Sequence, residues 1–335
     1  MVGEGSGGRG GVVASGLVGG NTDAGDCGAG DSFNFSSDIL SGRAGGSLSL
    51  VTWNCACLLG GAPVDERGRR RQSGKERRIV DLALKCDVVL LQEVHGTHED
   101  LASIKCLIPG HLVCGSFCDS RGAGGVVIIV HPRLRSRFGD SWSVREVFPG
   151  RAVILDLGIN APGAVDSTSR LDILSFCCVH VVPAWSDSVK RNFFLQLRDA
   201  VPRDSDSVFY VGGDFNFPSD GEGRLNIASG RVVVSNDPVA SFFEALFEDL
   251  TEIAQDRPTR KRVEGGEVTV LSRIDRIFSS IPPGELLGRN ANAVTIGKLT
   301  AKSDLSDHIP VAARICSREL LSTGRSFVPC WFLFL

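Results

Sequence analysis

Polar residues that could bind a cation or act as an acid or base follow two apolar runs in the first third of the sequence. Asn54 closes the run 48–53, and Glu93 comes directly after the run 88–92. An isolated buried charge is costly, so a carboxylate at the end of a buried strand must be solvated, paired or bound to a cation. For Glu93 this leaves two alternatives, metal ligation and a strand cap. Asn54 taken alone is also compatible with a simple turn.

A third polar group has a more specific pattern. Asp214 and Asn216 follow the apolar run 208–211 and the pair Gly212 and Gly213. Two glycines allow the backbone to approach another segment closely, and a spacing of two predicts that both side chains lie on one side of an extended chain. The alternative is an Asx turn after a strand. The paired glycines and the matching Asn favour a chemical role.

Two histidines and two further carboxylates complete the set of candidates. Asp275 stands between two isoleucines in an alternating run, where an inward carboxylate needs a cationic or imidazole partner. Asp307 and His308 precede the last apolar run and could supply a cation ligand beside a titratable imidazole, or only a surface turn. His180 is flanked by apolar residues and could be a core histidine or part of the same site.

The elements that must position these side chains are short runs of the kind that forms β-strands. Strands are predicted at 48–53, 87–91, 125–130, 152–157, 171–179, 207–211, 268–271, 275–278 and 311–315. Apolar residues spaced by three to four predict helices at 75–84, 188–198 and 241–250. Many strands with few helices indicate two β-sheets packed face to face, with helices outside.

The composition describes a globular protein with an atypical start. Of 335 residues, 42% are hydrophobic, and the formal net charge is −3, so any polyanionic partner must be bound by local basic patches or by metal ions. Residues 1–46 contain 15 of the 40 glycines and are predicted to be disordered. We expect one domain over 47–316 and a separate tail over 317–335. Neither a secretory signal nor a membrane span is expected, which predicts an intracellular protein.

Together the motifs resemble the endonuclease/exonuclease/phosphatase family, which includes deoxyribonuclease I-like and abasic-site nucleases. Five short motifs occur in the family's order: Trp53-Asn54, Leu91-Gln-Glu93, Gly212-Gly-Asp-Phe-Asn216, Arg273-Ile-Asp275 and Ser306-Asp-His308. The resemblance implies an α/β fold, a four-layer sandwich of two mostly antiparallel β-sheets flanked by helices. It also implies hydrolysis of a phosphodiester or phosphomonoester with Mg²⁺, for which Mn²⁺ can substitute.

The resemblance also implies roles for the metal-binding residues. Asn54 and Glu93 would hold the cation, and Asp307 would contribute from the far side. A hard divalent cation with oxygen ligands suits phosphoryl transfer, which needs positioning and charge neutralisation more than covalent catalysis.

The same resemblance implies the catalytic residues. Asp214 would orient or deprotonate the attacking water, and Asn216 would position the water or the phosphate. His308, oriented by Asp275, would contact the scissile phosphate and stabilise its developing charge. His180 is similar to the family's histidine on the phosphate-contacting or leaving-group side.

The branch of the family is indicated by three segments. Ser272-Arg-Ile-Asp275, the strand at 122–129 and the sequence 257–260 look like endonuclease domains of LINE-type (non-LTR) retrotransposons, which nick target DNA. Abasic-site repair is the alternative, but Tyr210 is the only tyrosine, so a catalytic tyrosine at the usual place is absent. A phosphatase or phospholipase with the same core, and a decayed module that only binds, also remain open.

Basic residues suggest where double-stranded DNA would bind. Arg69 and Arg70 follow Asn54 in a predicted loop, and Arg257 and Arg260 lie on a predicted hairpin that could probe a groove. Interleaved acidic residues make a solvated face the alternative for the first cluster. An enzyme acting on genomic DNA would work in the nucleus.

Overall fold

The computed structural model describes residues 47–59, 73–138, 141–158, 173–202, 207–219, 221–234, 237–253, 255, 257–288, 291–300 and 305–316. The segments predicted as a disordered start and a tail, 1–46 and 317–335, lie outside the described residues, and so do Arg69 and Arg70. Among the described segments, no helix combines the length and the apolarity that a membrane span requires.

The first large sheet has the strand order β15-β16-β1-β2-β4-β3. Its strands are β1 (Ser47–Asn54), β2 (Val88–Gln92), β3 (Leu112–Ser116), β4 (Val126–Val130), β15 (Asn292–Thr295) and β16 (Val311–Cys316). β1 and β2 are parallel, and every other neighbouring pair is antiparallel. A parallel pair at the centre of the sheet therefore ends at one common edge.

The second large sheet repeats this plan, with the order β11-β14-β8-β7-β6-β5. Its strands are β5 (Trp142–Phe148), β6 (Ala152–Gly158), β7 (Ile173–His180), β8 (Ser207–Asp214), β11 (Thr251–Glu252) and β14 (Asp275–Ser279). Here β7 and β8 form the central parallel pair, and the other neighbours are antiparallel.

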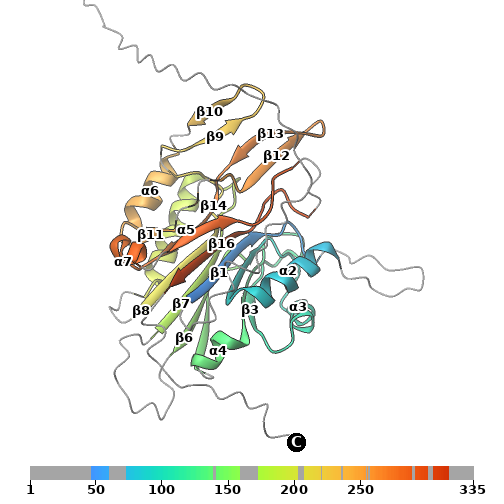
Figure 1. The fold of residues 1–335 in the computed structure, drawn as a ribbon, viewed down its shortest axis with the longest axis vertical. Helices are drawn as coiled ribbons and strands as arrows, with labels where there is room; N and C mark the ends of the chain where they lie inside the picture. The colour runs from blue at the N-terminus through green and yellow to red at the C-terminus, as the bar shows by residue number, and fades with distance from the viewer. Residues whose placement is uncertain are drawn as a thin grey trace, which may run out of the picture.

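Helices cover the outer faces of both sheets. α2 (Gly74–Lys85) and α3 (Leu101–Leu107) lie on one side and α5 (Asp187–Ala200) and α6 (Pro238–Leu246) on the other (Figure 1), with the short helices α4 (Pro132–Phe138) and α7 (Pro283–Gly288) near the edges. One apolar cluster lies between the sheets, a second joins α5 and α6 to the second sheet, and a third joins α2 and α3 to the first. Three apolar layers define a four-layer sandwich, which confirms the predicted fold class.

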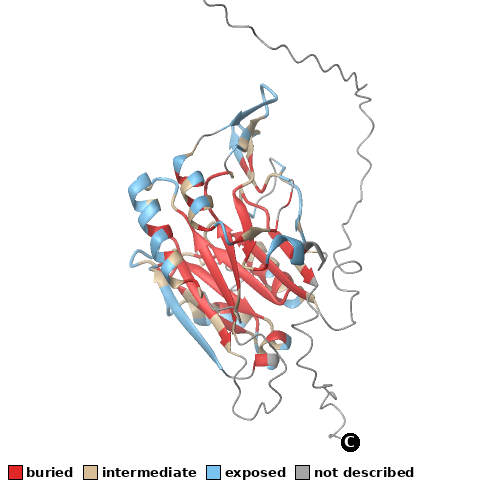
Figure 2. Ribbon diagram, turned by 90° about the vertical axis from the view of Figure 1, so that its left-hand side faces the viewer, coloured by how far each residue is buried: buried red, intermediate tan, exposed pale blue. Residues whose placement is uncertain are grey.

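The central strands are buried on both faces, which explains their uninterrupted apolar sequences (Figure 2). In β2, Val88 and Leu90 point into the cluster between the sheets, whereas Val89 and Leu91 point toward the helices. A strand that is covered on both sides needs apolar residues at every position, not at alternate ones.

A small sheet with the order β10-β9-β13-β12 projects from one end of the sandwich (Figure 1). Its strands are β9 (Gly223–Asn226), β10 (Arg231–Val234), β12 (Arg260–Glu264) and β13 (Glu267–Ser272). β12 and β13 form the hairpin predicted ahead of Asp275.

All the predicted strands are present, to within a few residues at their ends. Most of the strands that were not predicted from the sequence are exposed or short. Five of the seven residues of β5 and all four of β10 are exposed, so no apolar run marks these strands. The predicted helix 241–250 was misplaced, since α6 spans Pro238–Leu246. Asp237 caps its first turn by accepting from the Val239 amide at 2.9 Å, and Pro238 occupies a position that needs no amide hydrogen.

Candidate active site

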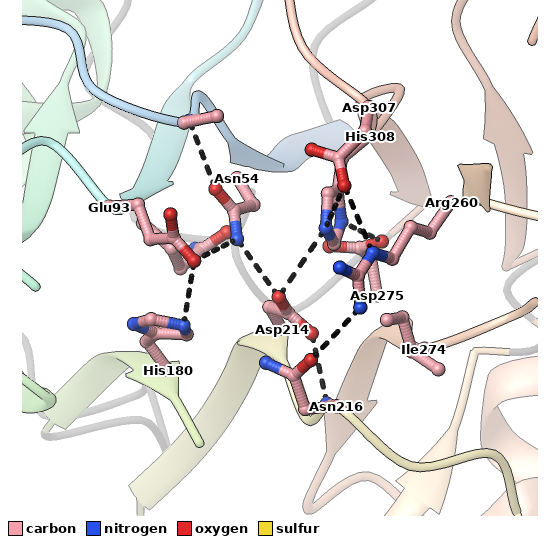
Figure 3. A network of polar contacts seen from close by, with 12 residues as sticks. Asn54, Glu93, His180, Asp214, Asn216, Arg260, Ile274, Asp275, Asp307 and His308 are labelled. Atoms are coloured by element: carbon pink, nitrogen blue, oxygen red, sulfur yellow. Dashed lines mark hydrogen bonds and ion pairs between the residues drawn. The ribbon is translucent and has the colours of Figure 1, made fainter. Parts of the chain in front are cut away.

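The predicted polar residues gather where the two parallel strand pairs end (Figure 3). Asn54 and Gln92 are register partners at the ends of β1 and β2, and His180 and Asp214 are partners at the ends of β7 and β8. Because the sheets pack face to face, these two edges meet. Asn54 Nδ2 donates to Asp214 Oδ2 at 2.9 Å, which joins the first sheet to the second.

The paired glycines before Asp214 permit this approach. A Cβ atom on Gly213 would lie 1.9 Å from the carbonyl oxygen of Val179 in β7, and one on Gly212 would lie 2.9 Å from Leu90 Cδ1 in the facing sheet. Any larger residue at Gly213 would therefore collide with backbone. The interpretation of these glycines as close-approach positions is confirmed.

One half of the site is built around Glu93. The Glu93 carboxylate accepts from Asn54 Nδ2 at 3.1 Å, and its Oε1 lies 3.1 Å from His180 Nε2. The contact with His180 is the main reason that the pKa of Glu93 is lowered to about 2, despite partial burial. Glu93 is therefore ionised at neutral pH, and its positive φ of 51° marks a backbone held in a strained conformation.

The other half contains the pair Asp275 and His308. His308 Nδ1 lies 2.8 Å and 3.0 Å from the two Asp275 carboxylate oxygens, and His308 Nε2 lies 3.7 Å from Asp214 Oδ2. Burial alone lowers the pKa of His308, but the negative charges of Asp275 and Asp214 raise it to about 9. The imidazole is therefore protonated at neutral pH. Thr259 Oγ1 accepts from the Asp275 amide at 3.1 Å and fixes this strand end.

Asp214 and Asn216 are connected by a turn as well as by their position in the site. Asp214 Oδ1 accepts from the Asn216 amide at 2.9 Å, while Oδ2 faces Asn54 and His308. The prediction that Asp214 and Asn216 share one side of an extended chain was wrong, because Asn216 has a φ of 59°. Its side chain still borders the site: Nδ2 donates to the Val181 carbonyl at 2.7 Å. Both sequence interpretations, turn and site, apply.

Arg260 lies inside the site, at the base of the hairpin. The prediction was that it lies on a hairpin that could probe a groove; in the structure Nη1 donates to Asn216 Oδ1 at 3.4 Å and Nε donates to Asp307 Oδ2 at 3.1 Å. Asp307 thus borders the His308 side, with Oδ2 3.9 Å from His308 Nε2. The structure brings Asn54 and Glu93 together, whereas the contacts of Asp307 are with Arg260 and His308. Arg257, the other predicted contact on this segment, is exposed.

The donor groups of the site fit a hard divalent cation. Two sets of described residues have atoms within 4.8 Å of one another: Glu93 with His180 and Asp214, and Asp214 with Asp275 and His308. In the first set the ionised Glu93 and the Asp214 carboxylate are joined by the Asn54 amide. Carboxylate and amide oxygens are the ligands that Mg²⁺ and Mn²⁺ prefer.

Sequence reasoning missed three residues that support the site. Arg151 Nη1 lies 2.6 Å from His180 Nδ1, Thr259 binds the Asp275 strand end, and Ser306 Oγ donates to the Asn54 carbonyl at 2.8 Å. Ser306 was part of a quoted motif, but no spacing in the sequence singles out Arg151 or Thr259.

The small sheet presents a basic face next to the site. Antiparallel partners and residues two apart in a strand point to the same face. The register pairs Asn226 with both Arg231 and Val270, and Val270 with Arg262. Four arginines therefore share one face: Arg224, Arg231, Arg260 and Arg262. Arg224 Nη2 donates to the Asn216 carbonyl at 3.3 Å, so this face continues into the site.

A model of the Endonuclease/Exonuclease/phosphatase family matches residues 51–308 of the chain. No curated protein sequence matches. The matched residues span all the site residues described above.

Solved structures with the same fold include an AP endonuclease and a 3'-5' exonuclease. The AP endonuclease LMAP from Leishmania major is 14% identical, with a TM-score of 0.54, over 81% of this chain and 88% of its own. The 3'-5' exonuclease NExo from Neisseria meningitidis is 16% identical, with a TM-score of 0.53, over 81% and 100%. A variant of NExo from Neisseria, 16% identical with a TM-score of 0.54 over 80% and 99%, was solved bound to product DNA hairpin. At these identities the likeness shows the fold.

Proposed function

The chain belongs to the endonuclease/exonuclease/phosphatase family, and we propose that it is a divalent-metal-dependent phosphodiester hydrolase that nicks double-stranded DNA, of the type found in LINE-like retrotransposons. One observation carries the proposal. Asp214 stands at the junction of the two sheets, with Asn54 and Glu93 on one side and the protonated His308 on the other. A carboxylate between a cation site and an imidazolium suits the hydrolysis of a phosphate ester.

The residues of the site have separate roles in the proposed reaction. Asp214 Oδ2 is the oxygen that accepts the proton of an attacking water, because it faces Asn54 and His308, whereas Oδ1 is turned to the Asn216 amide. His308 Nε2–H faces the same point and stabilises negative charge on the phosphate oxygens. Glu93 would hold Mg²⁺ or Mn²⁺ together with Asn54, whose Oδ1 now accepts from the Ala56 amide and would have to turn toward the ion. The cation would neutralise phosphate charge and polarise the water.

Arg260 completes the phosphate side of this arrangement. Its guanidinium is held between Asn216 and Asp307, so a charge-assisted donor lies beside the carboxylate that handles the water. Asp307 and Arg260 neutralise one another until a phosphate enters. Removal of Asp307 would therefore leave Arg260 free to move away from the reaction.

The basic face supports a polymeric substrate over a small phosphate ester. Arg224 and Arg260 border the site, whereas Arg231 and Arg262 lie farther along the same face, where a second or third phosphate of a nucleic acid would lie. The structure of NExo with product DNA is consistent with a nucleic acid partner for this fold. A genomic DNA substrate places the enzyme in the nucleus.

The retrotransposon type rests on the sequence Ser272-Arg-Ile-Asp275 and on the hairpin that precedes it. Arg273 in this motif is bound by both Glu222 and Glu252, so it supports the loop after β8 and does not contact substrate. The segment 257–260 then begins the hairpin that borders the site, as a groove-probing element requires.

The test is nicking of supercoiled plasmid by the full chain with Mg²⁺, Mn²⁺ or EDTA. We expect nicks with either cation and none with EDTA. The double variant Arg231→Gln, Arg262→Gln should lower the rate at low salt and reduce its salt dependence, without changing the turnover of bis(p-nitrophenyl) phosphate. Turnover of p-nitrophenyl phosphate without nicking by the folded protein would reject the DNA assignment in favour of a phosphatase.

A further inference from the structure

Arg151 makes an unusual contact with the buried imidazole at the end of β7. It follows Gly150 at the turn into β6, and its Nη1 lies 2.6 Å from His180 Nδ1. The His180 amide also donates to the Arg151 carbonyl at 2.8 Å, so backbone and side chain fix the pair together. Gly124, with φ +65°, passes so close that a Cβ atom would lie 2.9 Å from Arg151 Cζ. The absence of a side chain at Gly124 leaves room for this guanidinium.

This contact determines which nitrogen of His180 carries the proton. A guanidinium has only donors, so Nδ1 must accept from Arg151 through its lone pair. A neutral imidazole carries one hydrogen, which must then be on Nε2. Nε2 lies 3.1 Å from Glu93 Oε1, a distance that is compatible with this tautomer, while the Arg151 contact is the one that requires it.

The same contact removes His180 from metal coordination. To bind an ion through Nε2, the ring would have to move its hydrogen to Nδ1, where it would face the N–H of Arg151 at 2.6 Å. Histidines that bind metals show the opposite arrangement, in which the second nitrogen donates to a carboxylate, a carbonyl or water. His180 nevertheless lies in one group with Glu93 and Asp214, within reach of a shared ion.

We propose that Arg151 is a positioning residue that withholds the His180 lone pairs from the cation, so that Glu93 and Asn54 offer only oxygen ligands and the site is selective for hard cations. The inference rests on the proposed metal-dependent hydrolysis. Carboxylate and amide oxygens suit Mg²⁺ and Mn²⁺, while imidazole nitrogen raises affinity for Co²⁺ and Zn²⁺. Without Arg151, the same three side chains Glu93, His180 and Asp214 would form a nitrogen-containing site of the zinc type.

The test is titration of the metal-free full chain with Co²⁺, followed by its visible absorption bands. In the wild type we expect the bands and the affinity to be the same as in His180→Asn. Arg151→Met should bind Co²⁺ at least about tenfold more tightly and gain intensity, as expected when a ligand is added to a site. Arg151→Lys should behave as the wild type, because an ammonium also donates to Nδ1.

Two further variants make the result decisive. The gain in Co²⁺ affinity and band intensity must disappear in the double variant Arg151→Met, His180→Asn. This variant also shows how much Co²⁺ is bound elsewhere, for example by the half-buried Cys57. Arg145→Met, which removes an exposed arginine of β5, should leave Co²⁺ binding unchanged. A wild-type spectrum that changes in His180→Asn would overturn the proposal, and so would an Arg151→Met protein without gain.

The comparison of the wild type with His180→Asn remains valid if Arg151→Met does not fold. The readout is metal binding and needs no substrate. A protein that fails to nick DNA but shows the Co²⁺ pattern would reject the proposed function alone, while nicking without the pattern would reject only the role of Arg151.

Discussion

The two buried histidines of the site have opposite partners. His180 meets the cation Arg151 at Nδ1, whereas His308 meets the anion Asp275 at the same ring nitrogen. Both rings are almost fully buried, at 3% and 4% exposure, so burial does not distinguish them. The partners distinguish them: the Arg151 guanidinium can only donate to Nδ1 of His180, whereas Asp275 stabilises the doubly protonated form of His308.

The two halves of the site therefore differ in charge. On the Glu93 side, the contact with the His180 imidazole lowers the pKa of Glu93 to about 2, which keeps a negative ligand for a cation. On the Asp214 side, His308 is positive and faces the place where a phosphate develops charge. One histidine, His180, thus supports metal binding, and the other, His308, stabilises negative charge that develops on the phosphate.

The largest effect is expected at the residue that both halves share. Asp214→Asn removes the carboxylate that contacts Asn54 and faces His308, and the nicking rate should fall by about 10³-fold or more, as for loss of a general base. Single-turnover nicking assays with the folded variant provide the measurement. Asp249→Asn, at an exposed ion pair with Arg198, is the matched control and should be unaffected. Activity within tenfold of the wild type would remove Asp214 from the chemistry.

The histidines should respond unequally to the same substitution. His308→Asn loses a positive charge and should lower the rate by about 10²-fold to 10³-fold, the range for one transition-state donor. His180→Asn keeps an N–H donor near Glu93 and should lower it only about tenfold. Parallel single-turnover measurements at saturating protein compare the two. Equal losses would mean that the two rings have the same role.

Stability should depend on pH through the His308 half. The pKa of His308 is raised from 6.5 to about 9 in the folded protein, so its stabilising contribution is complete below pH 6.5 and is lost as the pH rises through 9. The loss is at most about 3 kcal/mol, at about 1.4 kcal/mol per pH unit. Urea unfolding of the metal-free protein at pH 6, 7.5 and 9.5 measures it.

Asp275→Asn is the control for this pH dependence. Without the carboxylate, His308 loses the partner that raises its pKa, and the decline between pH 6.5 and 9 should flatten. A variant that retains the full wild-type slope would show that another group titrates in this range.

Much of the site was predictable because its residues lie at or near the ends of strands. Apolar runs buried on both faces identified the central strands. Each candidate carboxylate, amide or histidine came within such a run or next to one of its ends, so their meeting followed from the sandwich. That Asp275 needs an imidazole or a cation followed from its inward position, and the resemblance to the family identified His308 as that partner.

What could not be predicted depends on contacts across the fold. Arg151 lies 29 positions before His180, and only the antiparallel register of β6 and β7 brings the two together. The left-handed conformation of Asn216 depends on the turn with Asp214, and the inward direction of Arg260 depends on its ion pair with Asp307. None of these contacts follows from a regular spacing in the sequence, so none could be predicted from a sequence pattern.

The most direct test of the account is the protonation state of both rings in one experiment. Nitrogen-15 NMR of the metal-free protein with labelled histidine at pH 7, assigned with His180→Asn and His308→Asn, reports the hydrogens on each ring nitrogen. The account predicts that His180 is neutral with its hydrogen on Nε2 and that His308 carries hydrogens on both nitrogens. Two rings in the same state, or His180 with its hydrogen on Nδ1, would contradict it.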